Sequence, residues 1–341
     1  MSEIRYDRFY DTHVIVAPER LHRPDYAAYA EPEQTMEACP FCEGNEAMTP
    51  PEIFALSEGE RFANEGGWRT RVVPNLYKAV QIEAPHRHHG GTFEHWEGFG
   101  AHEVIIDTPR HHTSMRTWNE AETAAWLKTL RARVADLRRD GRIAYISLFK
   151  NEGSNAGATQ LHSHTQLIGL PLIPKTERHR YERCYLHYNE TGEALLATLL
   201  KYEEEVGKRI IEKVGEFSAY CPYASAYPFE VMVSSATASG QIDTLGDDQI
   251  ASLATLLCSL MKRMQRQLGA FHFNLVVVTP PLQLGTVPRE MLEQAEKACR
   301  FGIRIMPRIY RHGGFEAGTD IVINPVAPEL AAKLLRGEED A

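Results

Sequence analysis

Hydrophobic and polar positions follow two periodicities along the chain, and these predict helices and strands in a recurring order. Apolar residues recur at three- and four-residue steps in 119–140 and 247–268, so both segments are predicted to be amphipathic helices. A Leu- and Glu/Lys-rich stretch, 192–213, is interpreted as a solvated connecting helix. Short β-branched and aromatic runs predict strands at 102–107, 143–149, 162–170, 229–234, 271–279 and 301–306.

The order strand, helix, strand, strand occurs twice, with the two copies about 130 residues apart. This recurrence indicates an internal duplication of an α+β unit, in which two copies pack as one pseudo-two-fold body. We expect an N-terminal half, 1–185, and a C-terminal half, 186–341. The alternative is that the recurrence is the kind that any chain mixing helices and strands can show.

The segments between these elements are polar and rich in turn formers. Residues 43–70 are expected to be loop with short elements. The stretch 84–92 combines Pro, Gly and three histidines, and it is expected to be a mobile, solvent-exposed loop.

Composition places the chain among globular proteins. It has 341 residues, 43% of them hydrophobic and 24% charged, which is enough for a sizeable core. The net charge of −9 argues against a broad nucleic-acid surface. No apolar run approaches the roughly 18 residues of a membrane helix, and the polar N-terminus does not resemble a signal peptide. We therefore expect a cytoplasmic protein without membrane or nucleic-acid partners.

Cys39 and Cys42 form a Cys-x-x-Cys pair in a chain with few cysteines. Two thiolates at this spacing can bind one tetrahedral Zn²⁺, although two more ligands are then needed. A thiol–disulfide role is the alternative. Because Pro, Gly and acidic residues surround the pair, where a redox motif requires a strand and a helix, metal binding is favoured.

The segment His162-Ser163-His164-Thr165-Gln166 is the second candidate for chemistry. If it is a strand, two imidazoles and one carboxamide project from the same face. The preceding loop, 151–159, offers glycines, small side chains and backbone N–H groups suited to a phosphate. An anion site beside a strand-mounted imidazole is typical of phosphoryl transfer with histidine as nucleophile. The alternative is an ordinary polar strand with two surface histidines.

These motifs resemble, in order, those of the galactose-1-phosphate uridylyltransferase family, the nucleotidyltransferase branch of the histidine-triad superfamily. Several are specific, and their shared order through most of the chain makes coincidence improbable. The resemblance rests on residues 14–20 with Arg23-Pro24, 39–46, 49–52, 73–77, 108–111, 151–166, 222–225, 227–230, 314–316 and 324–325.

The resemblance implies a role for each matching residue. His164 becomes the nucleophile of a nucleotidyl-histidine intermediate, and Gln166 holds the phosphoryl oxygens. One structural zinc site, which iron could also occupy, is completed by Cys39, Cys42, His111 and His162, with His112 as the alternative to His111. The nucleotide site is lined by Arg20, Arg23, Asn75, Asn151, Gly153, Gly157 and Thr159, and the sugar site by Phe315 and Glu316.

The family further implies a homodimer and ping-pong transfer between a nucleotide sugar and a sugar phosphate or phosphate. The expected activity is hexose-1-phosphate (galactose-1-phosphate) uridylyltransferase with UDP-glucose, and the alternative is an ADP-sugar phosphorylase. A non-catalytic nucleotide- or metal-binding module is the third possibility. Two departures keep the nucleoside open: residues 301–305 lack a second His-x-His, so a second metal is not expected, and Ser163 replaces the usual Pro.

Overall fold

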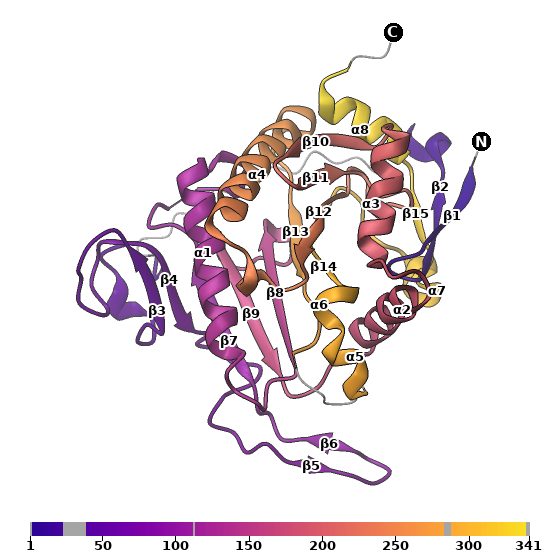
Figure 1. The fold of residues 1–341 in the computed structure, drawn as a ribbon. Coiled ribbons are helices and arrows are strands. Elements are labelled where there is room, and N and C mark those ends of the chain that lie inside the picture. The colour runs from indigo at the N-terminus through magenta and orange to yellow at the C-terminus, as the bar shows by residue number, and fades with distance from the viewer. Residues whose placement is uncertain (1, 23–38, 112, 283–287, 339–341) are drawn as a thin grey trace.

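The computed structural model of the chain describes residues 2–22, 39–111, 113–282 and 288–338, and its centre is a ten-stranded sheet (Figure 1). Every neighbouring pair of these strands is antiparallel. The spatial order is β10 (Ile210–Val214), β11 (Phe217–Tyr220), β12 (Val231–Ser239), β14 (Arg300–Pro307), β13 (Phe273–Val278), β8 (Tyr145–Glu152), β9 (His164–Leu170), β7 (Ala101–Ile106), β4 (Trp68–Pro74) and β3 (Phe54–Ser57).

The sheet has the same strand order on either side of its central pair, β8 and β13. Outward from the centre, one half runs β8, β9, β7, β4, β3 and the other runs β13, β14, β12, β11, β10. In each half a long helix directly precedes the central strand in the chain: α1 (Glu120–Leu137) precedes β8, and α4 (Asp247–Leu268) precedes β13. The α+β class and the antiparallel sheet are confirmed. The predicted boundary at 185/186 lies within α2 (Lys175–Thr191), the helix that joins the halves, and as a domain division it stays a prediction.

Helices α1 and α4 pack side by side on one face of the sheet. Helix α1 begins with a capping box, in which Asn119 and Glu122 each accept a hydrogen bond from the other's backbone N–H. The apolar positions that predicted the two helices all lie in the main hydrophobic core: Trp126, Leu127, Leu130, Val134 and Leu137 in α1, and Ile250, Leu253, Leu256, Leu257, Leu260 and Met264 in α4.

The opposite face is covered in the second half by other helices. On β12, Val231 and Val233 belong to the core under α4, whereas the alternate residue Met232 packs with Leu196 and Leu200. These helices are α2, α3 (Leu195–Val206), α5 (Arg289–Glu293) and α6 (Ala295–Ala298).

The prediction of a solvated helix over 192–213 is wrong in two respects: the helix ends earlier, and several of its leucines are buried. Helix α3 ends at Val206, followed by Gly207 with φ +70°, and β10 begins at Ile210. Leu195, Leu196 and Leu200 are buried because α3 packs on β12. Lys201, Glu204 and Glu205 of this helix are exposed, whereas Glu203 is buried and pairs with Arg209 at 2.7 Å.

Segments from both ends of the chain form a second, smaller sheet (Figure 1). Strand β1 (Glu3–Asp7) pairs antiparallel with β2 (Thr12–Val16), and β2 pairs in parallel with β15 (Val322–Asn324). Helices α7 (Gly314–Thr319) and α8 (Pro328–Arg336) flank β15 in the chain. The short 3-10 helices are η1 (Pro18–His22), η2 (Glu46–Met48), η3 (Met115–Thr117), η4 (Ser154–Ala156) and η5 (Ile242–Thr244).

The expected loop 84–92 is part of a projecting hairpin. Strands β5 (His88–His89) and β6 (His95–Trp96) pair antiparallel, and Figure 1 shows them extending away from the body of the molecule. The histidines of this stretch are exposed, as expected. Among the helices of the described ranges, none has the length and apolarity needed to cross a membrane.

Candidate functional site

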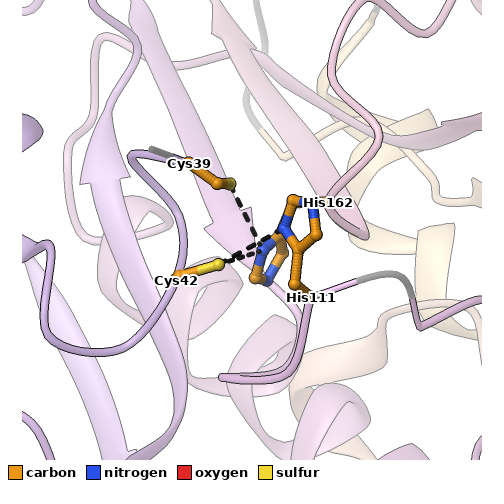
Figure 2. Close-up of side chains that lie close together, drawn as sticks. All are labelled: Cys39, Cys42, His111 and His162. Carbon is orange, nitrogen blue, oxygen red and sulfur yellow. Dashed lines mark hydrogen bonds between the residues drawn. The ribbon is translucent and has the colours of Figure 1, made fainter. Parts of the chain in front are cut away.

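The structure brings together the four side chains predicted to bind metal. The ligand atoms of Cys39, Cys42, His111 and His162 all lie within 4.8 Å of one another. Figure 2 shows both thiols directed toward the imidazole rings. The residues come from three separate segments: the turn 39–42, the segment after β7 and the residues just before β9. His112 lies outside the described residues.

The spacing of these atoms fits a tetrahedral zinc ion. With Zn–S near 2.3 Å and Zn–N near 2.0–2.1 Å, tetrahedral ligand sulfur and nitrogen atoms are about 3.6 Å apart. Nδ1 of His162 is 3.6 Å from Cys39 Sγ and 3.7 Å from Cys42 Sγ, and Nδ1 of His111 is 3.3 Å from Cys42 Sγ. The donor set therefore has the chemistry and the size of a closed Cys₂His₂ site.

The groups around His162 set its tautomer and keep its ring neutral, as a metal ligand requires. Its Nε2 lies 2.7 Å from the carbonyl oxygen of Thr108, so Nε2–H donates there and Nδ1 keeps its lone pair toward the sulfurs. Burial lowers the pKa of His162 to about 4, which keeps the ring neutral. Burial and the neighbouring Cys39 raise the pKa of Cys42 to about 11, so a thiolate there needs a compensating cation.

His164 and Gln166 lie on the sheet face opposite α1. On β9, Thr165 accepts a hydrogen bond from Trp126 Nε1 of α1 and Leu167 belongs to the core beneath that helix, so the alternate residues face the other way. The strand begins at His164, and His162 precedes it. The predicted common face is therefore confirmed for His164 and Gln166.

One of the two ring nitrogens of His164 is engaged in a hydrogen bond, and the other keeps its lone pair. Nδ1 donates to the main-chain oxygen of His162 at 2.9 Å, which leaves the lone pair on Nε2. Burial lowers the pKa of His164, and the charge of Lys150 acts in the same direction. Phe41, between the two metal-site cysteines, packs 5.7 Å from the His164 ring centroid to centroid. A neutral imidazole with a lone pair on Nε2 can act as a nucleophile.

Beneath the His-Ser-His segment lies a buried ion pair that the sequence analysis missed. The ammonium group of Lys150 donates to Asp107 Oδ2 at 2.9 Å, to Ser163 Oγ at 2.8 Å and to the main-chain oxygen of His164 at 3.2 Å. Both charged side chains are fully buried. Ser163, the departure from the family motif, is thus one of the groups that satisfy a buried lysine.

Asn75 and Gln166 meet at a third residue, His102. Asn75 directly follows β4, and its Nδ2 is 3.0 Å from His102 Nε2. Gln166 Oε1 is 3.1 Å from the same nitrogen. His102, which the sequence analysis did not single out, therefore lies between a predicted nucleotide-site residue and a predicted phosphoryl-site residue.

Asn151 is held by a partner from the second half of the chain. It lies opposite Asn274 in the β8–β13 pair, and Asn274 Nδ2 donates to Asn151 Oδ1 at 2.8 Å. The same Nδ2 donates to the carbonyl oxygen of Ala156 at 2.8 Å. One amide thus ties strand β8 to the loop that follows it.

The two loop glycines adopt conformations that other residues rarely adopt. Gly153 has φ +84° and Gly157 has φ +87°. A Cβ on Gly153 would lie 2.1 Å from Cδ2 of His272, whereas the nearest atom to a Cβ on Gly157 would be Asn151 Nδ2 at 3.9 Å. Nδ1 of His272 also accepts a hydrogen bond from the N–H of Asn155 at 3.1 Å. The loop is therefore shaped by close contact with His272 at one end only.

A cavity of about 630 Å³ lies where the N-terminal segment, the loop and the C-terminal segment meet. It is lined by the predicted residues Arg20, Phe315 and Glu316, together with Asn155 of the loop. Two arginines and a histidine also line it: Arg308, Arg311 and His312. Such a lining suits an anionic, hydroxyl-bearing ligand. Thr159, the last residue of the loop 151–159, is exposed, and Arg23 lies outside the described residues.

The residues that sequence reasoning missed share one property: they act on a predicted residue rather than belong to a recognised motif. His102, Lys150 and Asn274 each interrupt the apolar residues of a strand, although Glu103 follows His102 and Asn151 follows Lys150. That interruption was the available signal, because a polar residue inside a buried strand needs a partner.

The chain is similar to known proteins over nearly its whole length. Residues 1–174 match the family model described as galactose-1-phosphate uridyl transferase, N-terminal domain. An ADP-glucose phosphorylase from Arabidopsis thaliana is 30% identical over 343 residues, covering 98% of this chain and 92% of the relative. A galactose-1-phosphate uridylyltransferase from Thermotoga maritima is 24% identical over 346 residues, covering 99% of both. A crystal structure of an ADP-glucose phosphorylase from Arabidopsis thaliana with bound ADP-glucose has TM-score 0.81 and 29% identity, covering 98% and 99%.

Proposed function

Because the chain belongs to the galactose-1-phosphate uridylyltransferase family of nucleotidyltransferases, we propose that it transfers a nucleoside monophosphate through His164, with an ADP-sugar as donor and inorganic phosphate as acceptor. The observation that carries the transfer step is the lone pair on His164 Nε2, secured by the Nδ1 hydrogen bond to the oxygen of His162. The Arabidopsis relative, similar over nearly its whole length, supports the choice of nucleotide.

The reaction takes two displacements at one phosphorus. His164 Nε2 attacks the α-phosphorus of ADP-glucose, a P–N bond forms, and the bond from phosphorus to the glucose 1-phosphate oxygen breaks. Glucose 1-phosphate leaves as an anion and needs no proton. An oxygen of inorganic phosphate then attacks the same phosphorus, ADP forms, and His164 is released.

The protein's side chains and backbone align the substrate and stabilise the phosphoryl group being transferred; they do not exchange protons with it. Both leaving groups are phosphates, so the barrier depends on alignment and on donors to the phosphoryl oxygens. The carboxamide of Gln166 and the backbone N–H groups of Gly153 and Ser154 are the proposed donors, because the N–H groups of the next three residues, 155–157, already donate within the protein. The cavity lined by Arg20, Phe315 and Glu316 is proposed to hold the sugar and its phosphate.

The metal is proposed to be structural zinc, with iron as the other candidate. Four protein ligands leave no position for a reacting group, so zinc would supply only cross-linking of three segments. Phe41 connects that cross-link to the nucleophile, because it packs against His164.

A uridylyltransferase is the second candidate function. The Thermotoga maritima relative covers 99% of both chains, and the matching family model carries that name. In this case UDP-glucose is the donor, galactose 1-phosphate replaces inorganic phosphate, and UDP-galactose is the product. The first displacement is the same, so the two functions differ in nucleoside and acceptor only.

The cellular compartment and the oligomeric state are inferred as well. We infer a cytoplasmic protein, because a thiolate metal site needs reduced cysteines and all six cysteines are free. We also infer a homodimer, as the resemblance to the family implies.

The test is a paired assay of the two complete reactions. One mixture holds ADP-glucose and phosphate, the other UDP-glucose and galactose 1-phosphate, and His164→Asn is the control in both. The proposal expects ADP and glucose 1-phosphate from the first mixture at the higher rate. Turnover of the second mixture alone would make the chain a uridylyltransferase. Turnover of both mixtures by the His164→Asn variant would show that His164 is not the nucleophile.

A further inference from the structure

We propose that His102 is a positioning residue that fixes the carboxamide of Gln166 so that its NH₂ group faces the phosphoryl group being transferred. This inference rests on the proposed function, since it assigns a second residue to the same transfer step. The ring nitrogens of His102 lie within 3.1 Å of polar atoms of Gln166, Asn75 and the backbone of Ala79.

The sheet register places the two side chains within reach. Strands β7 and β9 pair so that His102 lies opposite Ile168 and Val104 lies opposite Gln166. His102 and Gln166 are therefore diagonal neighbours on the same face, a separation that long side chains can bridge. The observed Nε2–Oε1 distance is 3.1 Å.

The backbone decides which ring nitrogen carries the proton. The N–H of Ala79 donates to His102 Nδ1 at 3.0 Å, so Nδ1 must present a lone pair. A neutral imidazole then carries its hydrogen on Nε2, which makes Nε2 a donor. Its acceptor at 3.1 Å is Oε1 of Gln166. The amide oxygen is thereby occupied, and the amide nitrogen is left to point elsewhere.

This orientation matters because the two ends of a carboxamide act oppositely on a phosphate. The NH₂ group donates to phosphoryl oxygens, whereas the amide oxygen would repel them. A Gln166 side chain that is not held can turn over and present the wrong end. By holding Oε1, His102 removes that orientation before the substrate arrives.

The same tautomer has a consequence for Asn75. Its Nδ2 lies 3.0 Å from His102 Nε2, but a protonated Nε2 cannot accept from it. Asn75 Oδ1 already accepts from the N–H of Tyr77 at 2.8 Å. The NH₂ group of Asn75 is therefore left for an acceptor on the nucleotide, while the ring proton serves Gln166.

Two polar substitutions of His102 test the roles of its Nδ1 and Nε2 separately. His102→Asn can keep an acceptor near the Nδ1 position for Ala79 but has no donor that reaches Gln166. His102→Gln can place a donor near the Nε2 position. In single-turnover formation of nucleotidyl-His164 from ADP-glucose, we expect His102→Asn to be slower by on the order of tenfold, and His102→Gln to regain most of the rate. The dissociation constant for ADP-glucose, measured in the His164→Asn background, should change little.

A double-mutant cycle with Gln166→Ala decides whether His102 acts through Gln166. If it does, adding His102→Asn to Gln166→Ala costs no further rate. Equal losses in both backgrounds would overturn the positioning role, as would an unimpaired His102→Asn enzyme. Thermal unfolding and metal content of each variant check that the fold is kept. Wild-type protein that forms no adduct with ADP-glucose or UDP-glucose would instead overturn the proposed function, and the positioning role with it.

Discussion

The His164 imidazole donates from Nδ1 to the main-chain oxygen of His162, 2.9 Å away, while the His162 ring itself turns toward Cys39 and Cys42. The two rings use their nitrogens in opposite ways. His162 donates Nε2–H to Thr108, so the lone pair on its Nδ1 faces the two sulfurs, whereas His164 donates Nδ1–H, so its lone pair is on Nε2. A metal bound by this cluster would therefore fix the backbone that sets the tautomer of the proposed nucleophile.

Adduct formation should keep its rate at mildly acidic pH. The nucleophile must be neutral, and burial lowers the pKa of His164 from its ordinary value of about 6.5. The neutral fraction falls only as pH drops through this lowered value, so the acid limb of the rate must lie below pH 6.5. Single-turnover rates across pH measure this directly. Metal content is measured in the same samples as the control, and an acid limb centred above 6.5 would contradict the burial argument.

Removing one metal-site thiol should cost both metal and stability. Cys42→Ser is expected to lose stoichiometric zinc and to lower the unfolding midpoint by several degrees, because the cross-link between three segments is lost. Metal analysis and a thermal scan check this. Cys258→Ser is the matched control: Cys258 is a buried residue of α4 that contacts Thr123 of α1, outside the cluster, and its substitution should leave zinc unchanged. Full zinc retention by Cys42→Ser would contradict the assigned site.

The buried pair of Lys150 and Asp107 should show strong coupling. Lys150→Met leaves a buried carboxylate without its cation and is expected to lower the free energy of unfolding by about 3–5 kcal/mol. Adding Asp107→Asn removes the uncompensated charge, so the double variant should be more stable than Lys150→Met alone. Urea unfolding of the four proteins measures the coupling. Additive losses would mean that the two charges do not depend on each other.

The two loop glycines should differ in their tolerance of a methyl group. Gly153→Ala and Gly157→Ala both place alanine at positive φ, which costs roughly 1–2 kcal/mol. Only Gly153→Ala also meets the His272 ring, at 2.1 Å. We expect Gly153→Ala to displace the loop and slow adduct formation well below Gly157→Ala. Equal rates for the two variants would show that the His272 contact does not shape the loop.

Much of the fold could be predicted from periodicity because burial in this chain follows it closely. Every apolar position used to predict α1 and α4 is buried. The error at 192–213 has a local cause: leucines next to Glu and Lys have the same composition in a solvated helix and in one that packs by a single side. Gly207 was the available stop signal.

The site was predictable where a motif carried it. Cys39, Cys42, His111 and His162 meet as expected, and His164 and Gln166 share a face. His102 and Asn274 could not be found in this way, because each acts across a strand pairing that only the register creates. The sequence places Asn151 and Asn274 in different halves, and only the β8–β13 pair makes them neighbours.

The central claim is a covalent bond from His164 to a nucleotide, and intact-mass spectrometry tests it most directly. The protein is mixed with ADP-glucose or with UDP-glucose, without acceptor, beside the His164→Asn variant. The account predicts an AMP-sized mass increase with ADP-glucose that disappears in His164→Asn and on addition of phosphate. An increase with UDP-glucose alone would keep the mechanism and change the nucleoside. An adduct that persists in His164→Asn, or no adduct with either donor, would contradict the account.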